Sequence, residues 1–158
     1  MQASLATPDA PPPAPAAAEM FSVYQVPTGC INLMWPAVEP LLARAVARER
    51  GRFTTNDLYV WCARGEQQLW VITSRGRVWA ACLIRIHRHP TGKRSAILHL
   101  LAGRAPRAWA KEAWASWRQA CRLQGITEMQ IVGRKGWARI VRDFGFKPEA
   151  VVLTHEEI

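Results

Sequence analysis

The stretch SAILHLLAGRAPRAWAKEAWASWRQACRLQG, residues 95–125, joins an apolar run to an amphipathic one. Residues 95–103 are rich in Leu and Ala over a length typical of a strand, so they predict a strand in the interior of a sheet. In residues 107–123 the apolar side chains recur at helical spacing, which predicts a helix that ends at Gly125. A strand that passes through a short loop into a helix is a building unit of sheets covered by helices.

The residues before this stretch predict two helices and three strands. Apolar residues at helical spacing, followed by a glycine, predict helices over 35–51 and 54–65. Alternating apolar and polar residues predict strands over 20–27, 67–74 and 77–86, of which the last two form a hairpin.

The residues after it predict a strand over 127–133, a helix over 137–144 and a final strand over 150–157. In chain order the elements run strand, two helices, three strands, helix, strand, helix, strand. This order predicts an α/β fold in one domain, residues 20–158. Its central sheet is expected to be mixed and mostly antiparallel, with about six to seven strands flanked by about four helices.

The chain of 158 residues carries a formal net charge of +9, concentrated in its middle. Residues 52–147 contain 18 Lys and Arg but only 5 Asp and Glu. Such a surplus attracts phosphates, nucleic acid or an acidic protein, although it is also common on a solvated surface. No base-reading motif accompanies it, so contact with nucleic acid is expected to be non-specific.

Three features predict contact with other protein subunits. Residues 1–19 are rich in Pro and Ala and predict an extended arm that docks on a neighbour. Two tryptophans near element ends are expected to be exposed anchors, and basic residues gather around the last helix. The candidate partner-binding residues are Pro11, Pro12, Pro13, Trp35, Trp109, Arg134, Lys135 and Arg139.

The cysteines and histidines do not predict a metal site. Cys62, Cys82 and Cys121 lie among apolar neighbours, which is typical of reduced thiols in a core. His87 and His89 could be combined with Cys82 and His99 as zinc ligands, but their spacing matches no established pattern. The sequence has no apolar run long enough to span a membrane and no signal peptide, so we expect a soluble protein made in the cytoplasm.

The order of elements, together with GRKGWARIVRDFGFKPEAVVL (133–153), resembles the GNAT superfamily of acyl-CoA-dependent N-acetyltransferases over roughly residues 20–156. DFGF before the last strand is similar to the Gly-Phe that closes the last helix of that family. The stretches QQLWVITSRGRVW (67–79) and ILHLLAG (97–103), with the basic helix that follows, also resemble small GNAT-like proteins of tailed bacteriophages. Some of those proteins are components of the virion.

The resemblance implies a site for the pyrophosphate of CoA in the loop after residues 95–103. In the family this loop reads R/Q-x-x-G-x-G/A and binds phosphate through backbone N–H groups. Neither alignment completes the motif here: in one frame Leu100 replaces the Arg or Gln, and in the frame that starts at Arg104, Arg107 and Trp109 replace the glycine and the small residue. Pro106 also has no N–H to donate. Arginine side chains would then substitute for amides. The candidate cofactor-binding residues are Leu101, Gly103, Arg104, Ala105 and Arg107.

The resemblance also implies a catalytic acid and base. The tyrosine that protonates the thiolate in the family falls at Val141, and the only tyrosines, Tyr24 and Tyr59, lie in the first strand and second helix. No carboxylate lies between Glu66 and Glu112, which leaves His99 as the candidate base. A histidine at such a position is also common as a core residue.

Two functions follow from these observations. The first is a non-catalytic GNAT-fold component of a phage virion or its assembly, which would use no cofactor and be made in a bacterial host. The alternative is an active acetyl-CoA-dependent N-acetyltransferase with a divergent pyrophosphate loop. The two differ in whether the protein binds CoA.

Overall fold

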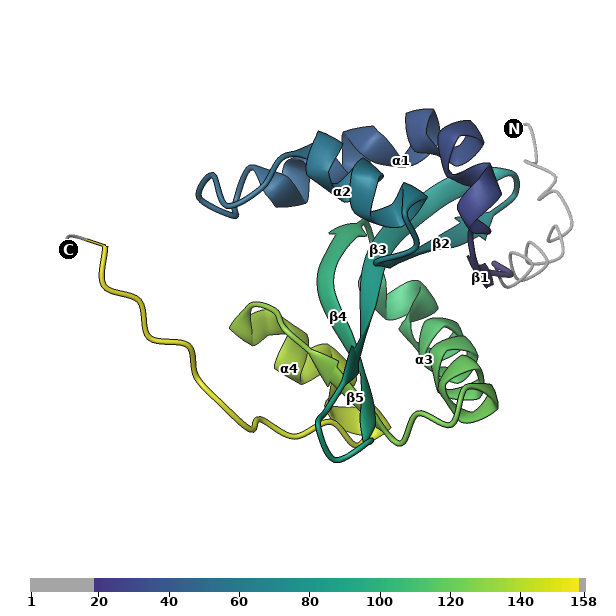
Figure 1. Ribbon diagram of the computed structural model, residues 1–158. Coiled ribbons are helices and arrows are strands. Elements are labelled where there is room, and N and C mark those ends of the chain that lie inside the picture. The colour runs from purple at the N-terminus through teal and green to yellow at the C-terminus, as the bar shows by residue number, and fades with distance from the viewer. Residues whose placement is uncertain (1–18, 157–158) are drawn as a thin grey trace, which may run out of the picture.

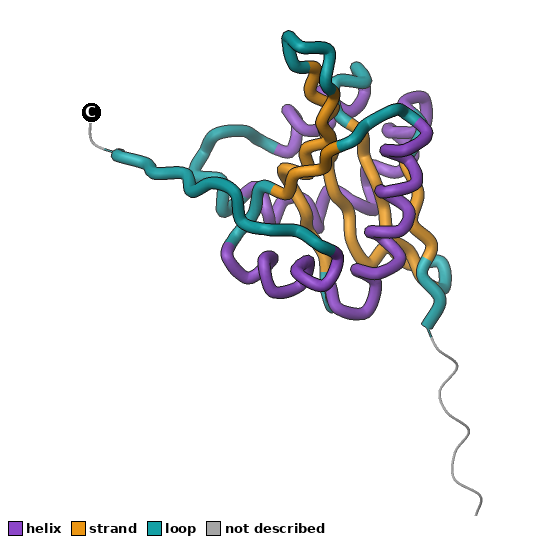
Figure 2. The backbone as a smooth tube through the Cα atoms, turned by 90° about the horizontal axis from the view of Figure 1, so that it is seen from below, coloured by secondary structure: helices purple, strands orange, loops and turns teal. Residues whose placement is uncertain are grey.

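The computed structural model describes residues 19–156, which form a five-stranded sheet covered by helices on both faces (Figures 1 and 2). The strands are β1 (Ser22–Gln25), β2 (Gln68–Ser74), β3 (Arg77–Arg88), β4 (Arg94–Gly103) and β5 (Glu128–Ile131). They lie side by side in chain order, antiparallel except for the parallel pair of β4 and β5. The prediction of a mixed, mostly antiparallel sheet in an α/β fold is confirmed.

The helices pack in two layers. Helices α1 (Ile31–Val46) and α2 (Thr55–Ala63) cover one face of the sheet, and α3 (Pro106–Leu123) covers the other (Figure 1). A short helix, α4 (Lys135–Val141), follows β5 and packs Trp137 on the same side as α3. Two 3-10 turns, Thr28–Cys30 and Arg142–Phe144, complete the described elements.

A bulge in β4 places two residues that are two positions apart, Leu98 and Leu100, on opposite faces of the sheet. Ile84 of β3 pairs with Leu98 and Leu83 pairs with Leu100, so β4 has one extra residue, His99. Without the bulge, Leu98 and Leu100 would share a face, because side chains alternate along a strand. Instead Leu98 lies in the core under α3, and Leu100 lies in the core under α1 and α2.

Trp109 was predicted to be an exposed anchor, and that prediction is wrong. The side chain is only 1% exposed, and its indole N–H donates to the carbonyl oxygen of Arg104 at 2.8 Å. Its position one turn into α3 places it on the face that packs against the sheet. Trp35 is half-buried and makes an edge-to-face contact with Tyr59, with ring centroids 5.2 Å apart.

Of the three cysteines predicted to lie in the core, Cys62 and Cys82 do, and Cys121 is only partly buried against it. Cys62 and Cys82 are buried, on the α2 side and the α3 side of the sheet respectively. Burial raises the pKa of Cys62 to about 12, and it also raises the pKa of the Cys82 thiol. Both thiols are therefore protonated and unreactive at neutral pH.

The predicted last strand is wrong, so the described sheet has five strands rather than about six to seven. Residues 150–156 pair with no strand and run away from the sheet (Figure 1). Val151, Val152 and Leu153 are 81%, 81% and 90% exposed. Residues that favour strands form one only where a neighbouring backbone pairs with them.

No helix among the described residues is long and apolar enough to cross a membrane.

Candidate functional site

Strands β4 and β5 part at the point where β4 is bulged. Their pairing ends at Leu98 and Ile131, and the N–H of Val132 donates to the carbonyl oxygen of Leu98 at 2.9 Å just beyond. From there β4 continues to Gly103, whereas the segment after β5 turns away into α4. The result is a split in the sheet that begins next to His99.

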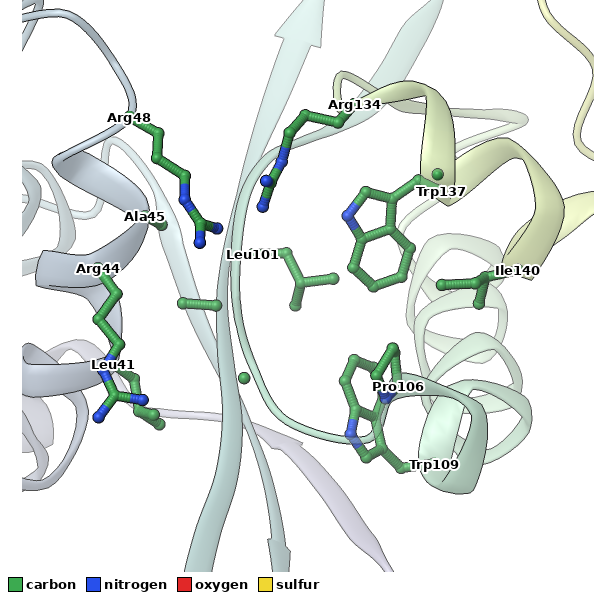
Figure 3. A pocket seen from close by; sticks show the side chains of 13 residues that line it. Leu41, Arg44, Ala45, Arg48, Leu101, Pro106, Trp109, Arg134, Trp137 and Ile140 are labelled. Atoms are coloured by element: carbon green, nitrogen blue, oxygen red, sulfur yellow. The ribbon is translucent and has the colours of Figure 1, made fainter.

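Two adjoining cavities, of about 570 Å³ and 120 Å³, lie along this split. The larger is walled by the last turns of α1, the end of β4 and the starts of α3 and α4 (Figure 3). The smaller lies around Leu98, His99 and Val132. Residues such as Leu101 and Trp137 line both, so the two cavities share a wall.

The larger cavity is strongly cationic. Arg44 reaches it from the last turn of α1, Arg48 from the turn just after that helix, and Arg134 from the start of α4 (Figure 3). No carboxylate lines this cavity, and none of the three arginines forms an ion pair within residues 19–156. Unneutralised guanidinium groups beside an apolar wall are suited to bind phosphate or carboxylate.

His99 is held neutral in the smaller cavity. Burial, together with the positive charge of Arg85, lowers the pKa of His99 to about 4. Its Nδ1 atom is buried and has no hydrogen-bond partner in the described part of the chain, and its ring lies edge-on to Phe53 at 6.4 Å. A polar atom left in this state is available to a ligand.

Glu49 is a site residue that sequence reasoning missed. It is the one carboxylate among the described residues that line the two cavities, and it shares the smaller cavity with His99. Its side chain is 31% exposed and lies 3.8 Å from Arg52. The sequence between Glu66 and Glu112 holds no carboxylate, whereas Glu49 follows α1 and reaches the site only through the fold.

Known proteins resemble this chain in structure but not in sequence. No protein family matches the sequence, and no curated protein does. A crystal structure of a probable acetyltransferase covers 87% of this chain and 99% of its own, with 14% identity and a TM-score of 0.65. A predicted acetyltransferase from Clostridium acetobutylicum, solved with acetyl-CoA, covers 87% and 96% with 14% identity and a TM-score of 0.62.

An aminoglycoside acetyltransferase from an uncultured soil metagenomic sample, solved with trehalose, covers 87% of this chain and 96% of its own at 14% identity, with a TM-score of 0.64. The chain has the GNAT fold. At this level of identity the likeness concerns the fold and not the activity. The bacteriophage resemblance finds no support among these structures, which are described as acetyltransferases.

In this GNAT fold the loop before α3 offers few amides to a phosphate. The N–H of Arg104 donates to the carbonyl oxygen of Trp79 at 3.1 Å, and the N–H of Ala108 donates to Ala105 at 2.9 Å. Pro106 has no N–H. The backbone amides of Ala105 and Arg107 remain.

The predicted cofactor-binding residues divide into two groups. Leu101 and Gly103 line the larger cavity, whereas Arg104, Ala105 and Arg107 are not among the residues that line either cavity. The guanidinium of Arg104 lies over the ring of Trp79, 4.4 Å from its centroid. Ala105 precedes α3 in a left-handed conformation, with φ of 47°.

The predicted partner-binding residues are not brought together. Arg134 lines the cavity, while Trp35 packs on α2 and Lys135 and Arg139 are exposed on α4. Pro11, Pro12 and Pro13 lie outside the described residues.

The site contains neither a tyrosine that could act as the catalytic acid nor, among the described residues, a set of metal ligands. Tyr24 and Tyr59 line neither cavity, and Val141 ends α4. Among the described residues, no group of three or more His, Cys, Asp and Glu is placed to hold a metal ion.

The buried state of His99 predicts a pH dependence of stability. In the unfolded chain its pKa returns to about 6.5. Below that value the unfolded state binds a proton more readily than the folded state, so the free energy of unfolding falls with decreasing pH. Between pH 7.5 and 5.0 we expect a loss of about 1–2 kcal/mol from this residue, allowing for the exposed part of the ring.

Urea unfolding of the wild-type protein and of His99→Gln at the two pH values measures this contribution. The variant is expected to lose less stability on acidification than the wild type. An equal loss in both proteins would show that His99 is not the group responsible.

Proposed function

We propose that the protein is an acetyl-CoA-dependent N-acetyltransferase whose cofactor lies in the split between β4 and β5. The split itself carries the proposal: a bulged β4 parts from β5 beside two adjoining cavities, of which the larger reaches the start of α3. The C. acetobutylicum protein of the same fold was solved with acetyl-CoA, which supports a thioester cofactor here. The comparisons support this alternative more than the phage-assembly interpretation.

The residues at the split fit such a cofactor through side chains more than through amides. Leu101 and Trp137 give the cavity an apolar lining that suits the pantetheine arm. The phosphates would be held by the guanidinium group of Arg134, which lines the larger cavity. Ala105 and Arg107 line neither cavity, but they flank Pro106, which does, so a phosphate at the start of α3 would meet their N–H groups and the Arg107 guanidinium.

When bound, acetyl-CoA supplies an acetyl thioester whose acyl group passes to an amine, with release of the CoA thiol. His99 is neutral at pH 7, so its ring can accept a hydrogen bond from the amine N–H and orient the lone pair of the nitrogen. With a pKa of about 4 it is too weak a base to keep the proton. The carboxylate of Glu49, in the same cavity and 31% exposed, takes the proton on to solvent.

Isothermal titration with acetyl-CoA tests the proposal. We expect saturable binding by the wild type and an affinity about tenfold lower for Arg107→Gln/Arg134→Gln, as for the loss of charge-assisted contacts to phosphate. The control is Arg118→Gln/Arg122→Gln, which removes two positive charges from exposed positions of α3 that line neither cavity. A wild-type protein that binds no acetyl-CoA would overturn the proposal.

A further inference from the structure

The end of α1 carries a cationic surface that the proposed cofactor does not account for. Arg44 lies in the last turn of α1 and Arg48 lies two residues beyond its end, and the side chains of both line the larger cavity (Figure 3). We refer to these two side chains as the α1 arginine pair.

The α1 arginine pair is not neutralised by the protein. The nearby carboxylate of Glu49 lies beside Arg52, and Glu156 pairs with Arg50. Within residues 19–156 no ion pair involves Arg44 or Arg48. Two guanidinium groups that share a cavity and repel each other are stabilised by an anionic ligand.

The pair also lies on the acceptor's side of the split. Helix α1 covers one face of the sheet, whereas α3, Trp137 and the start of α4 lie toward the other face (Figure 3). If the cofactor's phosphates lie at the start of α3, the leaving thiol occupies the α3 side of the split. The amine must then approach the thioester from the α1 side. An acceptor that enters there passes the α1 arginine pair.

We propose, on the basis of the proposed function, that the acceptor is an amine that also carries a phosphate or carboxylate group, and that the α1 arginine pair binds this anion. Both Arg side chains can present two parallel N–H donors to such a group. The same charges repel a polyamine, so the pair also excludes polycationic acceptors. Arg48 lines the smaller cavity too, which places the anion site next to His99 and Glu49.

The test uses O-phosphoethanolamine, with ethanolamine as the matched amine without the anion and spermidine as the polycation. Each is titrated into protein saturated with CoA, so that the phosphate sites of the cofactor are already filled. The wild type is expected to bind O-phosphoethanolamine at least about tenfold more tightly than the other two amines. Raising the ionic strength should reduce this difference, because the site is partly open to solvent.

Arg44→Gln/Arg48→Gln is expected to lose the preference for the phosphorylated amine and to keep its affinity for CoA. Arg118→Gln/Arg122→Gln is the matched control, with the same spacing and loss of charge on another helix, and it should keep both. Circular dichroism checks that each variant is folded.

Three results would overturn the inference. The first is a wild type without a preference for the phosphorylated amine, and the second is an α1 variant that retains the preference unchanged. The third is a loss of affinity for CoA in the α1 variant, which would assign the pair to the phosphates of the cofactor. Failure of the wild type to bind CoA at all, while O-phosphoethanolamine still binds through the pair, would overturn the proposed function and leave an anion site without acetyl transfer.

Discussion

Replacing Trp109 by alanine is expected to lower the free energy of unfolding by about 3–5 kcal/mol. The indole is only 1% exposed, packs in the core between the sheet and α3, and lies 6.5 Å from the ring of Trp137. Its removal leaves a large cavity and also deprives the carbonyl oxygen of Arg104 of its hydrogen bond. Urea unfolding of the wild type and the variant measures the loss.

Trp114→Ala is the control for this prediction. Trp114 lies on the same helix but is half-exposed and contacts Phe146, with ring centroids 4.9 Å apart. We expect a smaller loss of about 1–2 kcal/mol from this substitution. Equal losses from the two substitutions would contradict the assignment of Trp109 to the core.

Gly103→Ala is expected to cost about 3 kcal/mol of unfolding free energy, even without any cofactor. A Cβ atom at Gly103 would lie 2.4 Å from the Cβ of Ala80 and 2.7 Å from the carbonyl oxygen of Trp79. The backbone of β4 would have to move away from β3 to relieve this overlap. The glycine is therefore required by the packing of the two strands, whatever it does for a phosphate.

Gly136→Ala provides the comparison, because no atom lies within 4 Å of a Cβ at that position in α4. Alanine favours a helix over glycine, so this variant is expected to be as stable as the wild type or slightly more so. Thermal unfolding of the two variants in the absence of CoA distinguishes the positions. A Gly103→Ala protein as stable as the wild type would contradict the close approach of β3 and β4.

Most elements could be predicted because their signals are local. The helical spacing in residues 107–123 and the alternation in 67–74 and 77–86 correspond to α3, β2 and β3 with small differences at the ends. The prediction of the last strand failed because its apolar residues only favour an extended conformation. A strand forms where a neighbouring backbone pairs with that segment. Residues 150–156 have no such neighbour in the described fold.

The site could be predicted only in part, because residues far apart in sequence assemble it. His99, Leu101 and Gly103 were found from one strand and the loop after it. The bulge that aims His99 into the split depends on the register between β3 and β4, which periodicity does not reveal.

The arginines that line the cavity were the residues least predictable from the sequence. Arg134 was assigned to a partner surface because it lies in a basic cluster, but α4 turns it into the cavity. The sequence does not predict Arg44 and Glu49 as site residues, since the end of a helix with alternating charges usually faces solvent.

The agreement between strand order and chain order has a consequence for how the protein folds. Strands β2, β3 and β4 follow one another through connections of two and five residues, Arg75–Gly76 and 89–93, so their pairing requires the closure of only short loops. Such local contacts lower the contact order of the central meander and favour its early formation in the folding nucleus. The split beside β5 then forms late, when the chain has returned through α3, so the binding site is the part of the molecule expected to open first under mild denaturant.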